Sequence, residues 1–277
     1  MSKKVIFCTP TVTKPYPAYL AALEASVAPI QAAGWDEGAT NTIGNAYISY
    51  ARSEMLRKAM DAKADVVVFI DHDLSWAPGD LLKLIETPGD VVAGTYRYKS
   101  EPEEYMSVLD TDENHLPQTR ADGCIRARAV PAGFVKVTEE AVAKFMRAYP
   151  ELVYGPPYSP SVDLFNHGAH KGIWWGEDYA FSRRWNDCGG EIWIVPDLNI
   201  THHLPDKAFP GNLHQFLMKQ PGGALDPAQQ IKLRYKNCGQ DKPTPGTTLL
   251  GDWVCDGCYY GPPPGYGNRP IVPREAA

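Results

Sequence analysis

Five apolar residues run directly into two carboxylates within residues 64–76, ADVVVFIDHDLSW. The run Val66–Ile70 shows no polar alternation, which is typical of a strand covered on both faces inside a parallel sheet. Asp71 and Asp73 then stand at the carboxyl end of that strand, the edge where open α/β sheets bind ligands. Two carboxylates held this close repel each other unless a cation or a proton lies between them. The stretch therefore predicts a central strand that ends in a divalent-metal site.

Strands and helices alternate over the first hundred residues, which predicts a doubly wound α/β sheet. Apolar residues recur at helical spacing in some segments and form short unbroken runs in others. We expect strands over 5–7, 66–70 and 90–96, and helices over 18–33, 48–63 and 78–86.

The second half of the chain shows shorter pieces. We expect an irregular acidic stretch over 101–122, a strand over 125–137, a helix over 138–149, a loop over 155–160, a helix over 176–188 and a strand over 191–203. Residues 221–277 are rich in proline and glycine without periodicity, and they predict a loop-rich C-terminal extension.

Length and composition fit one large globular domain. The chain has 277 residues and 44% hydrophobic content, enough for a substantial core. No window reaches eighteen apolar residues and the start is too short for a signal-peptide core, so we expect a cytoplasmic protein with no membrane partner. The net charge of −6 argues against a surface that binds polyanions throughout, but it leaves a local basic groove open. Six dispersed cysteines fit a reducing compartment.

Three polar elements occupy the ends of predicted strands or helices: Asp71-x-Asp73 after a strand, Gly176-Glu177-Asp178 at the start of a helix, and His202-His203 at the end of a later strand. Together they resemble the GT-A glycosyltransferases, which are metal-dependent enzymes that use nucleotide sugars. The resemblance covers roughly residues 4–218. The segments YARSEMLRKAMDAKADVVVFIDHDLSW, DVVAGTYRYK and GEDYAFSRRW resemble the small stand-alone GT-A enzymes of bacteriophages.

This resemblance implies a fold, a domain division and an activity. The fold is a Rossmann-like α/β domain over 1–220, with a mixed, mainly parallel sheet flanked by helices. Residues 1–100 would form the nucleotide-binding half and 101–220 the acceptor half, followed by the extension 221–277. The activity is transfer of a sugar from a nucleoside-diphosphate donor, UDP-sugar favoured, to a hydroxyl group.

The resemblance also assigns the donor side of the site. Asp73 would coordinate the metal directly, and Asp71 would reach it through water or contact the ribose. His202 would complete the metal shell, with His203 as second choice. Oxygen ligands favour Mn²⁺ or Mg²⁺, with several positions left to the diphosphate. Three further residues would contact the donor. Arg52 would reach the nucleotide, and Thr9 and Pro10 would line the base.

On the acceptor side, Asp178 is the first candidate for the general base, with Glu177 second. In an inverting enzyme it takes the proton of the acceptor hydroxyl. Trp174, Trp175 and Gly176 precede these acids, and the two indoles offer flat apolar faces for stacking.

Each of these residues also has an ordinary structural alternative. Aspartates stabilise turns, and acids in the first turn of a helix complement its dipole, as Arg183 and Arg184 would later in the same helix. Arg52 could lie on a solvated helix face, and His202 could bond to backbone. Tryptophans such as Trp174 and Trp175 usually pack in cores or interfaces.

Other classes of function leave weaker signals. No Gly-x-Gly-x-x-Gly follows the first strand and no phosphate-loop pattern exists, which argues against dinucleotide and phosphate-loop enzymes. Cys255-x-x-Cys258 could form a structural zinc site with Cys238 and a fourth ligand such as His214, or a turn with free thiols. None of the histidines begins the His-x-Glu of a zinc deaminase. A non-catalytic binding module for a nucleotide sugar or nucleic acid would not need Glu177-Asp178.

The acceptor is the least constrained part of the prediction. Phage enzymes of this appearance include ones that glycosylate 5-hydroxymethylpyrimidines in DNA, so 5-hydroxymethylcytosine DNA is the favoured acceptor. A protein, glycan or small-molecule hydroxyl is the alternative. Residues that could contact phosphates and an unstacked base are Arg183, Arg184, Lys207, Lys219, Lys232, Arg234, Lys236, Trp253, Tyr259 and Tyr260.

Overall fold

A computed structural model describes residues 3–113 and 116–219 of the chain. The helices are α1 (Pro17–Ala32), α2 (Ile48–Asp61), α3 (Asp80–Glu86), α4 (Glu139–Ala148), α5 (Glu177–Asp187), α6 (Leu213–Lys219) and the 3-10 turn η1 (Pro150–Leu152). The strands are β1 (Lys3–Thr11), β2 (Trp35–Ile43), β3 (Val66–Ile70), β4 (Leu74–Trp76), β5 (Val91–Ala93), β6 (Val108–Leu109), β7 (Ile125–Ala129), β8 (Phe134–Thr138), β9 (Val153–Tyr154), β10 (Ser161–Val162), β11 (Gly168–His170), β12 (Ile173–Trp175), β13 (Ile192–Ile194), β14 (Ile200–His203) and β15 (Ala208–Gly211).

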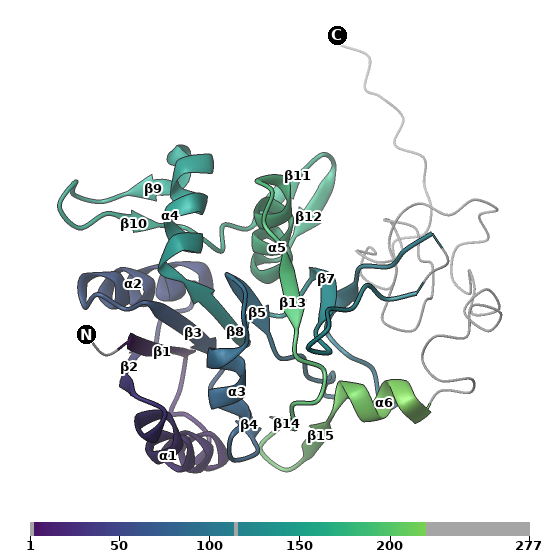
Figure 1. The fold of residues 1–277 in the computed structure, drawn as a ribbon. Helices are drawn as coiled ribbons and strands as arrows, with labels where there is room; N and C mark the ends of the chain where they lie inside the picture. Colours follow the sequence, from purple (N-terminus) through teal and green to yellow (C-terminus); the bar gives the residue numbers. More distant parts are fainter. Residues whose placement is uncertain (1–2, 114–115, 220–277) are drawn as a thin grey trace, which may run out of the picture.

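An eight-stranded sheet forms the centre of the protein, in the order β2-β1-β3-β8-β5-β13-β7-β6 (Figure 1). Strands β2, β1, β3, β5, β13 and β6 run in one direction, while β8 and β7 run against them. The expected mixed sheet with one predominant strand direction is confirmed. The division into a nucleotide-binding half and an acceptor half stays a prediction.

Helices cover both faces of the sheet, with α2, α4 and α5 on one side and α1 and α3 on the other (Figure 1). Strand β3 contributes to both layers because successive side chains alternate between faces. Val67 and Phe69 pack toward α2, α4 and α5, and Val66, Val68 and Ile70 pack toward α1 and α3. Every residue of β3 is buried, as the unbroken apolar run predicted.

The predicted helices all form, and their ends follow local chemistry. Pro17 begins α1, where the missing N–H of proline costs no hydrogen bond. Thr138 caps α4, its hydroxyl oxygen accepting from the Ala141 amide at 3.2 Å. No helix among the described residues has the length and apolar character needed to cross a membrane.

Three predictions about strands were incomplete. Strand β2 was not predicted, because its sequence WDEGATNTI has little apolar alternation; it forms by parallel pairing along β1 at the sheet edge. The segment 125–137 is two strands, β7 and β8, which lie apart in the sheet with β5 and β13 between them. The segment 191–203 likewise divides at Pro196 into β13 of the large sheet and β14 of a small one.

The small sheet, in the order β15-β14-β4, positions part of the polar site. Strand β4 begins one residue after Asp73, and β14 pairs with it so that His202 lies opposite Leu74. The His203 amide donates to the Asp73 carbonyl at 2.8 Å. A strand from late in the sequence is thereby fixed beside the aspartates that follow β3.

Candidate active site

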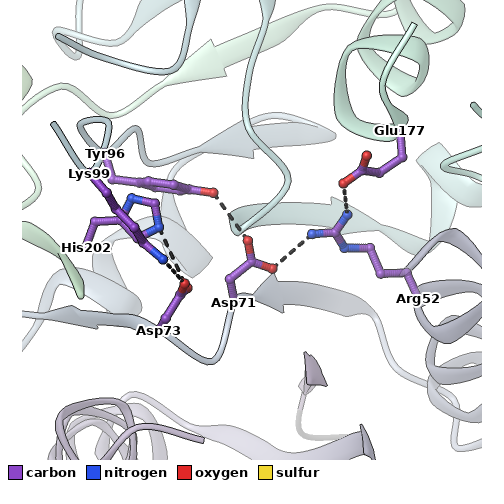
Figure 2. Close-up of polar contacts among 7 residues, drawn as sticks. All are labelled: Arg52, Asp71, Asp73, Tyr96, Lys99, Glu177 and His202. Carbon is purple, nitrogen blue, oxygen red and sulfur yellow. Dashed lines mark hydrogen bonds and ion pairs between the residues drawn. The ribbon is translucent and has the colours of Figure 1, made fainter. Parts of the chain in front are cut away.

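The two aspartates lie in a tight turn between β3 and β4, each in its own polar network (Figure 2). The turn is held by the Asp71 amide, which donates to the Gly133 carbonyl at 2.9 Å, and by the Leu74 amide, which donates to the Asp71 carbonyl at 3.2 Å. Asp71 faces Arg52 and Tyr96, whereas Asp73 faces the other side.

Arg52 links Asp71 to the start of α5. Its Nη2 lies 2.9 Å from Asp71 Oδ1, and its Nη1 lies 3.2 Å from Glu177 Oε1. Only 1% of Arg52 is exposed, and its guanidinium lies over the Phe165 ring. Burial opposes the charge, but Asp71 and Glu177 outweigh it and raise the pKa of Arg52. Arg52 is therefore a buried cation between two carboxylates, and its predicted contact with the nucleotide stays a prediction.

Tyr96 closes the other side of Asp71. Its hydroxyl lies 3.5 Å from Asp71 Oδ2, and its ring meets the His202 ring edge-on with centroids 4.9 Å apart. Burial, followed by the nearby Asp71 charge, raises the pKa of Tyr96 well above its usual value. Tyr96 thus remains a neutral donor that touches both networks.

Gly133 provides the space in which these groups meet. A Cβ at this position would lie 2.2 Å from the Tyr96 hydroxyl and 2.4 Å from Asp71 Oδ2. Real atoms do not approach so closely, so any side chain at 133 displaces Asp71 or Tyr96.

We expect Gly133→Ala to lower the free energy of unfolding by about 1–3 kcal/mol, the usual cost of overpacking. Activity should fall about a hundredfold, because Asp71 moves. Urea unfolding and turnover measure the two effects. The matched control for stability alone is Gly176→Ala, whose Cβ would meet only Asp178 Oδ1, at the ordinary contact distance of 3.6 Å. Unchanged stability in Gly133→Ala would show that the site has more room than the structure gives it.

Asp73 belongs to a network with Lys99 and His202 (Figure 2). Its Oδ2 accepts a hydrogen bond from the Lys99 ammonium and lies 3.6 Å from His202 Nε2. Burial alone would raise the pKa of Asp73, but His202 and Lys99 outweigh it and hold the pKa well below its usual range. Asp73 is therefore ionised at neutral pH.

The pair Asp73 and His202 fits a divalent cation. His202 Nδ1 lies 3.0 Å from the Arg97 carbonyl, which can only accept a hydrogen bond, so Nδ1 carries a proton and Nε2 faces Asp73. This is how metal-binding histidines are usually oriented. Two ligands of one ion, each about 2.1 Å from it, lie about 3.0 Å apart in octahedral geometry and about 3.4 Å apart in tetrahedral geometry. The observed separation of 3.6 Å is slightly longer than either value.

The predicted three-residue metal set is not assembled. Among residues 3–113 and 116–219, no group of three or more His, Cys, Asp or Glu side chains is arranged to hold an ion. Asp71 is turned toward Arg52 and Tyr96, which occupy its oxygens. His203, the second choice, lies on the other face of β14, with its Nε2 2.8 Å from Ser75 Oγ. Of the predicted metal ligands, Asp73 and His202 face each other, and their metal role stays a prediction.

Glu177 and Asp178 both lie in the first turn of α5, but their environments differ. Glu177 forms an ion pair with Arg52. Burial, followed by repulsion from Glu177, raises the pKa of Asp178 to about 6, although its Oδ1 accepts from the Tyr179 amide at 2.8 Å. Of the two acids, Asp178 therefore has the proton affinity suited to a base near neutral pH.

The other predicted site residues lie on β1 and on the β11–β12 hairpin and the residue that follows it. Thr9 and Pro10 are buried within β1, and the Thr9 hydroxyl bonds to Tyr19 of α1. Trp174 is 63% exposed on the β11–β12 hairpin, and Arg183 lies over the Trp175 ring. Their proposed donor and acceptor roles stay predictions.

The zinc and DNA predictions fall mainly outside the described residues. Cys238, Cys255 and Cys258 lie outside the described residues, as do all the predicted DNA-contacting residues beyond Lys219. Within the described part, Arg183 pairs with Asp187 and Lys207 lies 3.8 Å from Glu101. Arg184 bonds to Asn166.

Two functional candidates were missed at the level of sequence: Tyr96 and Lys99. Both follow β5, whose end lies close to that of β3 because only β8 separates the two strands. The signal was present in the sequence GTYRYK, a cluster of polar and aromatic residues at the carboxyl end of an apolar strand.

No family model matches the sequence. No curated protein matches it either.

Solved structures show a partial likeness of fold. A197 from STIV is 16% identical, with a TM-score of 0.45 over 76% of this chain and 94% of that one. The catalytic domain of Drosophila beta1,4-galactosyltransferase 7, in complex with xylobiose, is 12% identical, with a TM-score of 0.40 over 87% of this chain and 84% of that one. GalNAc-T7 with UDP, GalNAc and Mn²⁺ is 13% identical, with a TM-score of 0.39 over 73% of this chain and 44% of that one.

Proposed function

We propose that this chain is a metal-dependent glycosyltransferase of the GT-A type, which moves a sugar from a nucleoside-diphosphate donor, UDP-sugar favoured, to a hydroxyl group. The observation that carries the proposal is an excess of negative charge at the carboxyl end of β3. Four carboxylates, those of Asp71, Asp73, Glu177 and Asp178, share two cations, Arg52 and Lys99. The excess of two negative charges equals the charge of one divalent cation.

A donor diphosphate could not approach this site without such a cation, because the carboxylates would repel it. Asp73 and His202 would hold the ion from the protein side, and a Mg²⁺ or Mn²⁺ site usually leaves its other positions to phosphate oxygens and water. When bound, the metal neutralises the charge that develops on the leaving nucleoside diphosphate. Arg52 pairs with Asp71 and with Glu177, and it thereby holds the turn after β3 next to the start of α5.

On the acceptor side, Asp178 serves as the general base of an inverting transfer. It takes the proton of the acceptor hydroxyl while that oxygen bonds to the sugar carbon and the bond from this carbon to the diphosphate oxygen breaks. Glu177 pairs with Arg52, and its proximity raises the proton affinity of Asp178. Trp174, exposed just before α5, offers an apolar face for a sugar or a base.

The proposed acceptor is the hydroxyl of 5-hydroxymethylcytosine in DNA. The support is the resemblance of three sequence segments to small phage enzymes. Hydroxyls of proteins, glycans and small molecules are the alternatives that the same base could serve.

The test is transfer of label from a panel of uridine and guanosine diphosphate sugars onto 5-hydroxymethylcytosine DNA, with and without Mn²⁺. Plain-cytosine DNA and water are the controls. We expect metal-dependent transfer from one donor to the modified DNA only. Metal-dependent hydrolysis without transfer to DNA would retain the glycosyltransferase and reject the DNA acceptor. Silence with every donor would contradict the enzyme and favour a non-catalytic binding module.

A further inference from the structure

We infer that Lys99 holds the cation position on Asp73 in the metal-free protein, that it leaves when a divalent cation binds, and that the released ammonium then binds the donor diphosphate. The inference depends on the metal site of the proposed function. According to this inference, Lys99 lowers the affinity of the site for the metal, an effect that can be measured without catalysis.

Competition follows from one shared oxygen. The Lys99 ammonium bonds to Asp73 Oδ2, and the same Oδ2 lies 3.6 Å from His202 Nε2 (Figure 2). An ion held by Asp73 and His202 needs the oxygen that Lys99 occupies. A monovalent and a divalent cation in contact with one oxygen repel each other strongly, so only one of them can stay.

The side chain of Lys99 can leave without movement of the backbone. Its exposed fraction is 27% and that of Asp73 is 15%, so the pair opens toward solvent. The backbone around it is held by the Tyr98 amide, which donates to the Glu104 carbonyl at 2.9 Å. Arg97 Nη2 also donates to the Ser100 carbonyl at 3.0 Å. Movement is therefore confined to the flexible lysine stem.

Charge balance favours a second use for the released ammonium. With a divalent cation bound, the four carboxylates are matched by that ion, Arg52 and Lys99. An incoming diphosphate adds negative charge, and Lys99, anchored three residues after Tyr96, remains within the site. Lysine is a common phosphate ligand because its ammonium acts as a compact point charge.

The first measurement is Mn²⁺ affinity without any donor, from the electron paramagnetic resonance signal of free Mn²⁺. We expect Lys99→Met to bind Mn²⁺ about tenfold more tightly than the wild type, because a partly buried ion pair no longer competes. Asp73→Asn should lose the binding, which identifies the site. Lys83→Met is the matched control; it removes a lysine that pairs with another carboxylate, Asp197, and not with Asp73.

The second measurement is UDP affinity at saturating Mn²⁺, by calorimetry. Here we expect Lys99→Met to bind UDP about tenfold more weakly, since the phosphate-binding ammonium is gone. The two effects have opposite signs. A purely structural lysine would weaken both kinds of binding when removed. Lys99→Gln repeats the test with a polar side chain, should the methionine variant fold poorly.

The outcomes separate the inference from the proposed function. Equal or weaker Mn²⁺ binding in Lys99→Met, with normal binding in the wild type, overturns the inference and leaves the metal site intact. Absence of Mn²⁺ binding in both proteins contradicts the metal site itself. A third outcome would also overturn the inference: wild-type transfer that continues in the presence of chelator but is lost in Lys99→Met. In that case Lys99, and not a metal ion, would neutralise the charge on the leaving diphosphate.

Discussion

Asp73→Asn is expected to reduce metal-dependent transfer on the order of a thousandfold and to remove Mn²⁺ binding. The substitution keeps the shape of the side chain but removes the negative charge that holds Lys99 and faces His202. Without that charge the ion loses its one carboxylate ligand from the protein, and the departing diphosphate loses the charge stabilisation that makes it a good leaving group.

Transfer and Mn²⁺ binding should be measured on the same preparation, with Asp197→Asn as the matched control. Asp197 also pairs with a lysine, Lys83 at 2.5 Å, but it lies after β13 and far along the chain from the turn that follows β3. Asp197→Asn should therefore keep both properties. Full activity of Asp73→Asn in the presence of chelator would exclude a metal role for this residue.

The position of Asp73 illustrates what the sequence could reveal. Five apolar residues without alternation identified a buried strand, and the carboxyl ends of such strands bind ligands, so the location of the aspartates followed from local sequence alone. The start of α5 was equally readable, because Gly176 precedes two first-turn acids. Both features depend only on residues close together in the chain.

The partners of these residues could not be predicted in the same way. That Arg52 bridges Asp71 and Glu177 depends on three elements that meet only in the folded sheet. Gly133 is required because Asp71 and Tyr96 crowd it, not because of its own backbone angles, so no local turn signal marks it. Strand β2 forms because β1 offers a free edge, which allows pairing by a segment with a polar sequence.

Asp178 lies beside Glu177, which pairs with Arg52, and we predict that it acts as the general base of transfer. We expect Asp178→Asn to lower the transfer rate about 10²- to 10⁴-fold, the usual contribution of a general base. Donor binding should stay nearly unchanged, because the proposed metal ligands of the donor side, Asp73 and His202, lie on other elements. Calorimetry with UDP and Mn²⁺ measures donor binding, and single-turnover transfer measures the chemical step. A loss of UDP affinity instead would place Asp178 on the donor side.

The pH profile gives an independent test of the same residue. Burial and Glu177 raise the pKa of Asp178 to about 6, so the carboxyl group is protonated below that pH and cannot accept a proton. Wild-type transfer should therefore rise with pH through about 6 and level off above it, and Asp178→Asn should lack this rise.

Two further variants make the assignment specific. Asp187→Asn, at the other end of α5 and paired with Arg183, should keep the wild-type profile. Glu177→Gln removes the repulsion that raises the Asp178 pKa, so its rise should move to lower pH. If Glu177→Gln abolished the rise while Asp178→Asn retained it, Glu177 would be the base, and the ion pair with Arg52 would have to open during the reaction.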